Sequence, residues 1–153
     1  MGETSKVRQY VGEYVQGFGI DVGCGDDKIR PQAIGLDTIH HPCTTIVREL
    51  KDLKLFGDKQ FDYVYSSHFL EHLDSPEKML KEMYRVLKVK GYLVLFIPDK
   101  DRYTENNPAH KHMWDVAQFA GMLEKVFGKK MQVEDCLVTD FDYSYLYVLS
   151  RVK

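Results

Sequence analysis

Two short apolar runs end in residues that could together hold a nucleoside. The run Phe18-Gly19-Ile20-Asp21-Val22 leads into the turn Gly23-Cys24-Gly25, and the run Ala33-Ile34-Gly35-Leu36 ends on Asp37. Glycine allows a sharp turn at the end of a strand, so that backbone N–H groups come close to a ligand. An acid that ends the next parallel strand can accept hydrogen bonds from both hydroxyls of a ribose. The spacing therefore predicts half of a nucleoside-binding site.

The residues between these two features favour a cationic ligand. A dinucleotide site requires three glycines and a helix that faces the pyrophosphate, but Asp27 stands where the third glycine would fall. The connection 26–32 is short and contains Pro31, which excludes a full helix. Asp26 and Asp27 would repel a pyrophosphate and tolerate an ammonium or sulfonium group. A lone Gly-x-Gly also fits an ordinary tight turn, so the assignment depends on the rest of the chain.

Histidines near predicted strand ends and loops supply candidate bases. A hydroxyl group must lose its proton when another group is transferred to its oxygen. Histidine titrates close to neutral pH and can accept such a proton. We rank His68 and His110 first as catalytic residues, ahead of His112. For His72, a packing role on a helix is the better explanation.

The segment His68-Phe69-Leu70-Glu71-His72 supports a different hypothesis, a zinc metallohydrolase. The pattern His-x-x-Glu-His can place two zinc ligands and a base, Glu71, on one helix, with Asp74, His110 and His112 as candidates to complete the zinc shell. Here the strand pattern continues up to His68, and the better helix start is Ser75. We therefore expect no resident metal under the preferred interpretation. Stoichiometric zinc in the purified protein would favour the hydrolase.

Length and composition indicate one compact domain over residues 1–153. The chain is 44% hydrophobic and 12% aromatic, which is enough for a substantial core. The net charge of -2 provides no field that would attract nucleic acid. Cys24, Cys43 and Cys136 lack metal-type spacing, and neither a signal peptide nor a long apolar span is present. These features predict a cytoplasmic protein without a membrane segment.

Apolar periodicity predicts strands that alternate with helices. One helix begins at Ser75-Pro76 and continues through Leu87 to a stop before Gly91, and another runs from about Asp115 to Gly128. A first helical stretch covers 7–15. The predicted strands are 18–23, 33–38, 44–49, 61–67, 91–97, 131–138 and 144–152. This order predicts an α/β, Rossmann-like, seven-stranded and mostly parallel sheet with helices on both faces and ligands at the strands' carboxyl ends. No helix separates the last two strands, so the last strand is expected to be antiparallel.

Several segments, in order and spacing, resemble the class I S-adenosylmethionine-dependent methyltransferases, in particular the small group called methyltransferase type 11. The resemblance covers almost the whole chain. The segments that carry it are Gly19-Ile20-Asp21-Val22-Gly23-Cys24-Gly25, Ile34-Gly35-Leu36-Asp37, Glu49-Leu50-Lys51-Asp52-Leu53, Phe61 to His72, and Arg85 to Leu95. The last of these is similar to a passage whose usual form contains Leu-Lys-Pro-Gly-Gly.

The resemblance implies S-adenosylmethionine as the cofactor and an unidentified methyl acceptor as the other partner. It assigns the methionyl part to Asp21, Gly23, Cys24 and Gly25, the ribose to Asp37 with Thr38 beside it, the adenine to Asp52 and Leu53, and the sulfonium and acceptor to Ser66, Ser67 and His68. The implied reaction is an in-line displacement at the methyl carbon by an acceptor oxygen or nitrogen.

Two features bear on the acceptor. The shortened first crossover, without its helix, is similar to methyltransferases that modify glycans or lipid-linked sugars, which favours a glycan or small metabolite. Only about six residues precede the first helical stretch, too few for a large lid. An open site suits a large acceptor, or a lid supplied by the second subunit of a homodimer. A third hypothesis is a catalytically idle methyltransferase-like module that only binds a partner.

Overall fold

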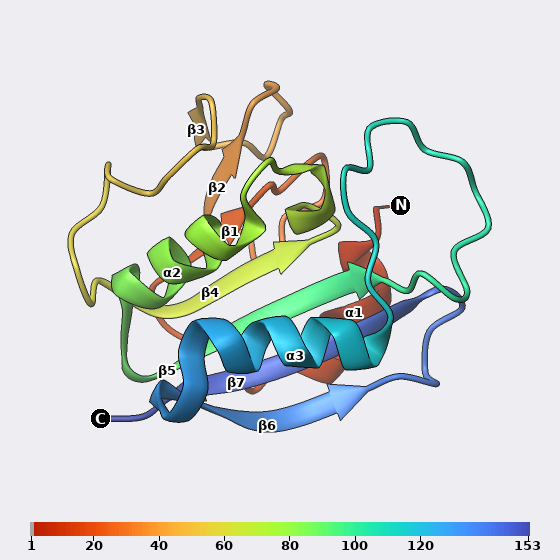
Figure 1. Ribbon diagram of the computed structural model, residues 1–153. Helices are drawn as coiled ribbons and strands as arrows, with labels where there is room; N and C mark the ends of the chain where they lie inside the picture. The colour runs from red at the N-terminus through yellow and green to blue at the C-terminus, as the bar shows by residue number, and fades with distance from the viewer. Residues whose placement is uncertain (1) are drawn as a thin grey trace.

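The computed structural model describes residues 2–153, which form a seven-stranded sheet in the order β3-β2-β1-β4-β5-β7-β6 (Figure 1). The first five strands in the chain pair in parallel, and β7 lies antiparallel between β5 and β6. The strands are β1 (Gly19–Val22), β2 (Ile34–Asp37), β3 (Ile46–Val47), β4 (Phe61–Ser67), β5 (Leu87–Pro98), β6 (Met131–Leu137) and β7 (Ser144–Arg151). The predicted fold, including the antiparallel last strand, is confirmed.

Helices cover both faces of the sheet. One face carries α2 (Pro76–Val86) and α3 (Val116–Phe127), and the other carries α1 (Thr4–Val11) (Figure 1). Because successive side chains of a strand point to opposite faces, β4 contributes to both cores. Val64 packs in the cluster beneath α2 and α3, whereas Tyr65 packs in the cluster beneath α1.

The connection between β1 and β2 contains no helix, as the sequence predicts. Turns and bends occupy this connection, and two of its residues, Ile29 and Ala33, are buried against α1. The loop itself therefore covers the part of the sheet that a crossover helix would otherwise cover.

The boundary between α2 and β5 differs from the prediction. Helical periodicity carries Leu87 into the helix, but α2 ends at Val86 and Leu87 pairs with Phe61 of β4. Pairing with a buried strand overrides the local helical preference. Lys90 then adopts a φ of 65°, a left-handed conformation that favours glycine, before Gly91 passes close to β4.

Two other elements are shorter or shifted. The expected strand 44–49 is reduced to the two residues of β3 at the sheet edge, and the first helix begins and ends earlier than 7–15. The start of α3 follows the sequence closely, because Asp115 and Gln118 form a reciprocal capping box.

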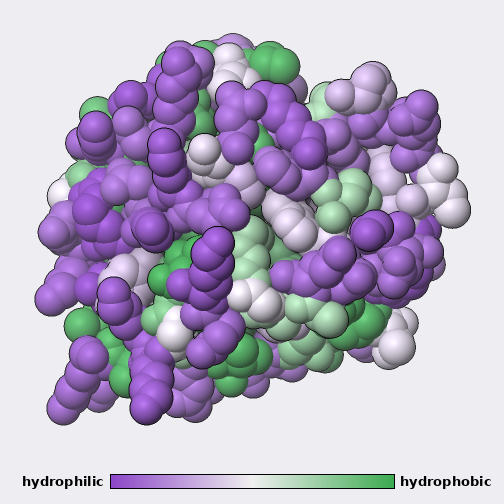
Figure 2. Space-filling model, viewed as in Figure 1, coloured by the Kyte–Doolittle hydropathy of each residue, from purple (hydrophilic) through white to green (hydrophobic). Residues whose placement is uncertain are grey.

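Hydrophilic side chains cover most of the face seen in Figure 2, with hydrophobic residues gathered toward its centre and lower part. The two short helices are η1 (Leu70–His72) and η2 (Gly128–Lys130). Among the helices of residues 2–153, none has the length and apolar composition needed to cross a membrane.

Candidate functional site

A pocket of about 790 Å³ opens at the carboxyl ends of β1, β2 and β4. This is the edge where ligands bind in open parallel sheets. Its lining comprises residues 2–4, 23–27, 37–39, 49–51, 67–69 and 72–75, together with Lys78, Met79 and Lys111. The pocket is large enough for a nucleoside with an extended substituent.

The glycine turn after β1 forms one wall. Gly23 and Gly25 have φ values of 75° and 54°, which side chains rarely adopt. A Cβ atom on Gly23 would lie 2.5 Å from the ring of Phe69, so this position accepts no side chain. The turn is held to β2 because the N–H groups of Gly23 and Cys24 both donate to the carbonyl of Leu36, at 2.8 and 3.0 Å.

Asp37 is fixed at the rim beside this turn. Its Oδ2 accepts a hydrogen bond from the Gly25 N–H at 2.8 Å, and its Oδ1 accepts one from the Ile39 N–H at 3.0 Å. A carboxylate has about four lone-pair sites, so Asp37 keeps acceptors for ligand hydroxyls. Thr38 follows it on the pocket lining.

The segment after β3 contributes different residues from those expected. Leu50 and its neighbours Glu49 and Lys51 line the pocket, but Asp52 and Leu53 do not. Asp52 accepts a hydrogen bond from the Lys54 N–H, and Leu53 is buried in the core. The expectation that Asp52 and Leu53 face the adenine is therefore corrected.

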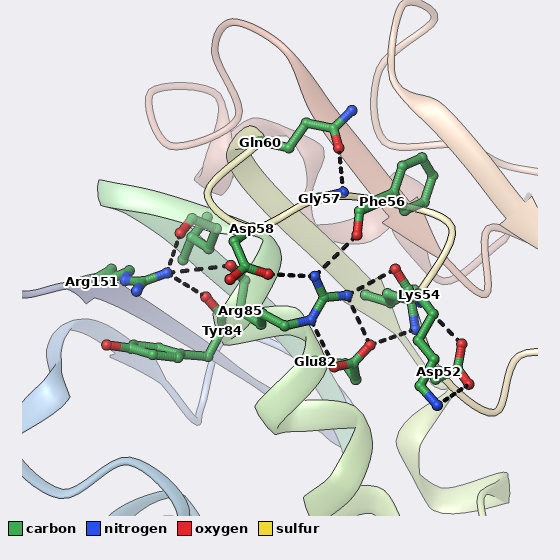
Figure 3. A network of polar contacts seen from close by, with 12 residues as sticks. Asp52, Lys54, Phe56, Gly57, Asp58, Gln60, Glu82, Tyr84, Arg85 and Arg151 are labelled. Carbon is green, nitrogen blue, oxygen red and sulfur yellow. Dashed lines mark hydrogen bonds and ion pairs between the residues drawn. The ribbon is translucent and has the colours of Figure 1, made fainter.

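Arg85 of α2 holds this segment in place (Figure 3). Its guanidinium donates to the carbonyls of Leu53 and Phe56, each at 3.0 Å, and to the carboxylate of Glu82. Hydrogen bonding from Arg85 lowers the pKa of Glu82. The Glu82 carboxylate in turn accepts the Leu53 N–H at 3.0 Å. The helix thus fixes the backbone immediately after Leu50.

Replacement of Arg85 by alanine should lower the free energy of unfolding by about 2 kcal/mol, because two carbonyls and the carboxylates of Glu82 and Asp58 lose their donor. Urea denaturation measures the loss. Arg85→Lys should recover less than half of it, since an ammonium cannot span both carbonyls. Lys81→Ala, on the exposed side of the same helix, is the matched control. Equal stabilities of Arg85→Ala and Lys81→Ala would contradict this role.

Comparisons with known proteins agree with this geometry. A family model described as "Methyltransferase domain" matches residues 20–95. These residues include the glycine turn, Asp37 and the segment after β3 that Arg85 holds in place. The chain belongs to the class I S-adenosylmethionine-dependent methyltransferases.

Solved methyltransferases share the fold at low sequence identity. A SAM-dependent methyltransferase from Archaeoglobus fulgidus has a TM-score of 0.73 at 17% identity, with 97% of this chain and 92% of that chain covered. The Burkholderia thailandensis 1,6-didemethyltoxoflavin-N1-methyltransferase, solved with its substrate and S-adenosylhomocysteine, has a TM-score of 0.74 at 14% identity, covering 98% and 76%. An uncharacterized protein of Methanocaldococcus jannaschii is 28% identical over 99 residues, 58% of this chain and 48% of that protein. The chain thus spans about half the length of this curated relative. S-adenosylmethionine is the cofactor of this methyltransferase class.

Asp21 supports the methyltransferase pocket from behind. It does not line the pocket and is 1% exposed. Its Oδ2 accepts the Ile29 N–H at 2.7 Å, which ties the β1–β2 connection to β1, while its Oδ1 has no hydrogen-bond partner among residues 2–153. Burial raises the pKa of Asp21 to about 7.

The two serines at the end of β4 lie in different environments. Ser67 lines the pocket, whereas Ser66 is buried and donates to the carbonyl of Val22 at 2.8 Å. Ser66 therefore joins β4 to β1, and the expectation that it borders the sulfonium is corrected.

His68 lines the pocket and His110 does not. The Nε2 of His68 lies 2.9 Å from the Oγ of Ser144 and 3.7 Å from Glu3. Burial lowers the pKa of His68 to about 4, so its imidazole is neutral at physiological pH. His110 instead packs its ring against His72, with centroids 4.8 Å apart.

The five residues 68–72 do not lie in one helix. His68 has a φ of 46°, and only Leu70–His72 form a short 3-10 turn. The helical zinc-hydrolase arrangement considered from the sequence is absent here.

Sequence reasoning missed the parts of the lining that come from distant segments. Glu3 and Thr4 arrive from the N-terminus, and Lys111 arrives from the loop 99–114 that extends beside the N-terminus (Figure 1). No local pattern marks them. The contribution of the start of α2 to the pocket lining was predictable, because a helix that follows β4 begins at the same edge of the sheet.

Proposed function

We propose that this chain transfers a methyl group from S-adenosylmethionine to an oxygen or nitrogen atom of an acceptor. The observation that carries the proposal is Asp37, whose carboxylate is fixed beside the Gly25 N–H at the rim of the pocket. This position suits the acceptance of hydrogen bonds from the two ribose hydroxyls. We treat residues 1–153 as a single domain for this activity.

For the adenine, Leu50 supplies an apolar wall and Glu49 an acceptor for the exocyclic amino group. Both residues lie in the segment 49–53, which resembles the part of the family's sequence beneath the adenine. Each stands three positions before its counterpart in the pair Asp52 and Leu53 that the resemblance implies. Arg85 keeps this segment against α2.

For the methionyl part, the turn Gly23-Cys24-Gly25 leaves space, and Asp26 supplies negative charge. Asp27 is paired with Arg8 at 2.5 Å, whereas Asp26 is exposed on the pocket lining and makes no ion pair among residues 2–153. Asp26 is therefore the carboxylate that remains for the cofactor's ammonium group.

In the reaction, a lone pair of the acceptor atom attacks the methyl carbon as the carbon–sulfur bond breaks, and that electron pair returns to sulfur. Alignment of donor and acceptor is the main task of the protein. We propose that His68, a neutral imidazole at the pocket, accepts the acceptor's proton, with Ser67 beside it. His110 lies behind His72 and is the weaker candidate for this role.

The acceptor that we favour is a glycan or small metabolite, because the pocket is open and the β1–β2 connection carries no helix. A dimer mate could supply the missing cover. The free thiols of Cys24, Cys43 and Cys136 suit a reducing cytoplasm.

Calorimetric titration with S-adenosylmethionine tests the proposal. Saturable binding to one site per chain is expected. Production of S-adenosylhomocysteine with a panel of hydroxyl and amine acceptors then separates an enzyme from an idle binding module. Absence of cofactor binding by the folded protein would overturn the proposal.

A further inference from the structure

Glu71 is a buried carboxylate without a hydrogen-bond partner in the described part of the chain. Its side chain is 0% exposed, and neither of its oxygens accepts a hydrogen bond among residues 2–153. An ionised carboxylate in such a place requires a cation or a hydrogen-bond donor. The imidazoles of His72 and His68 lie 3.7 and 4.0 Å from its Oε1.

The imidazoles of His72 and His110 converge on Glu71. One ligand atom each from Glu71, His72 and His110 lies within 4.8 Å of the other two. The backbone brings them together, because the N–H groups of Lys111 and His112 both donate to the carbonyl of Glu71, at 2.8 and 3.1 Å. The loop that contains His110 is thereby anchored on η1.

The hydrogen bonds of the two rings leave the same nitrogen available in each. The Nδ1 of His72 lies 3.0 Å from the carbonyl of Ala109, and the Nδ1 of His110 lies 3.2 Å from the sulfur of Met113. Donation from Nδ1 leaves a lone pair on Nε2. The Nε2 of His72 is 3.7 Å from Glu71. Outer hydrogen bonds of this kind orient histidine ligands in metal sites.

We infer that Glu71, His72 and His110 form a binding site for a zinc-type divalent ion at the wall of the cofactor pocket. One carboxylate and two imidazoles suit zinc, with a further position left for water or substrate. Bonds of about 2.0–2.2 Å would need the three ligand atoms to move inward by roughly 1 Å.

If the chain transfers methyl groups as proposed, a metal ion at this site would influence which kind of acceptor atom is methylated. His72 lines the same pocket as Asp37 and His68. An acceptor hydroxyl bound to such an ion would lose its proton to His68 more readily, because the ion would stabilise the resulting alkoxide. The methyl transfer itself would stay the same: the oxygen lone pair would attack the methyl carbon, the carbon–sulfur electron pair would go to sulfur, and the ion would serve only to lower the charge on the acceptor oxygen. The site therefore favours an oxygen acceptor over an amine.

Titration of EDTA-treated, desalted protein with zinc chloride tests the site. We expect one equivalent to bind, with His110→Ala and His72→Ala weakening binding at least tenfold and the exposed loop variant His40→Ala binding as the unmodified protein does. His110 lies on a loop, so its variant tests the site without disturbing the core. Magnesium chloride should bind at least tenfold more weakly than zinc, because imidazole is a poor ligand for magnesium.

Three results would overturn the inference: no saturable zinc binding, equal binding by His110→Ala and the unmodified protein, or magnesium bound as tightly as zinc. Titration of the same metal-free protein with S-adenosylmethionine tests the proposed function separately, because cofactor binding at Asp37 needs no ion. The two ideas can thus fail independently.

Discussion

Asp37→Ala should weaken S-adenosylmethionine binding about a hundredfold, equivalent to about 3 kcal/mol. The variant removes the acceptor for the ribose hydroxyls. It also removes the carboxylate that holds the Gly25 and Ile39 N–H groups at 2.8 and 3.0 Å. The cofactor would then lose its direct contacts and meet a turn that is no longer preorganised. Isothermal titration calorimetry gives the affinity.

Three further carboxylate variants test whether the loss of affinity is specific to Asp37. Asp37→Asn keeps the shape and one oxygen acceptor, so its affinity should fall between those of the alanine variant and the unmodified protein. Asp140→Ala removes a charge from an exposed loop residue far along the chain and serves as the control. Asp52→Ala decides between the two assignments of the adenine contact. A large loss of affinity with Asp52→Ala and none with Asp37→Ala would contradict both the ribose contact of Asp37 and the adenine contact of Glu49 and Leu50.

The sequence predicts features of the fold that depend on local patterns. The glycine turn and Asp37 each end a short apolar run, and parallel pairing of β1 with β2 is enough to bring them together. The capping box at Asp115 likewise needs only residues within one turn. The number of strands and the mostly parallel sheet with an antiparallel last strand follow from the alternation of strands with helices and from the helix-free last connection.

Features that depend on distant contacts could not be predicted in this way. Leu87 continues a helical period, but its pairing with Phe61 places it in β5. The family resemblance assigns Leu53 to the adenine, but its side chain is buried in the core, and Glu82 and Arg85 bind its backbone N–H and carbonyl. These are tertiary interactions that override a local preference.

The meeting of Glu71 with His110 is also non-local. The spacing of His68, Glu71 and His72 suggested a helical metal site, whereas the chain forms only a 3-10 turn there. The third ligand comes from a loop with no periodicity, and only the backbone hydrogen bonds to the Glu71 carbonyl place it. The sequence offers Asp74, His110 and His112 as third ligands, and only the folded chain selects His110 among them.

Asp21 should make the protein less stable as the pH rises. Burial raises the pKa of Asp21 to about 7 in the folded protein, from an ordinary value of 3.8. Between these two values the folded state binds more protons than the unfolded state, so the free energy of unfolding falls as the pH increases. The fall is complete above the folded pKa. At about 1.4 kcal/mol per pKa unit, full ionisation costs about 4 kcal/mol, of which about 3 kcal/mol falls between pH 5 and pH 8.

Asp21→Asn should flatten this slope, because an asparagine can still accept the Ile29 N–H but carries no titrating group. Urea denaturation of both proteins at a series of pH values measures the difference. Burial also raises the pKa of Glu71, to about 8, which adds a slope of the same sign to both proteins. The quantity that isolates Asp21 is therefore the difference between them at each pH. Parallel stability curves would show that Asp21 is ionised throughout, and that a compensating cation reaches its unpartnered Oδ1 in solution.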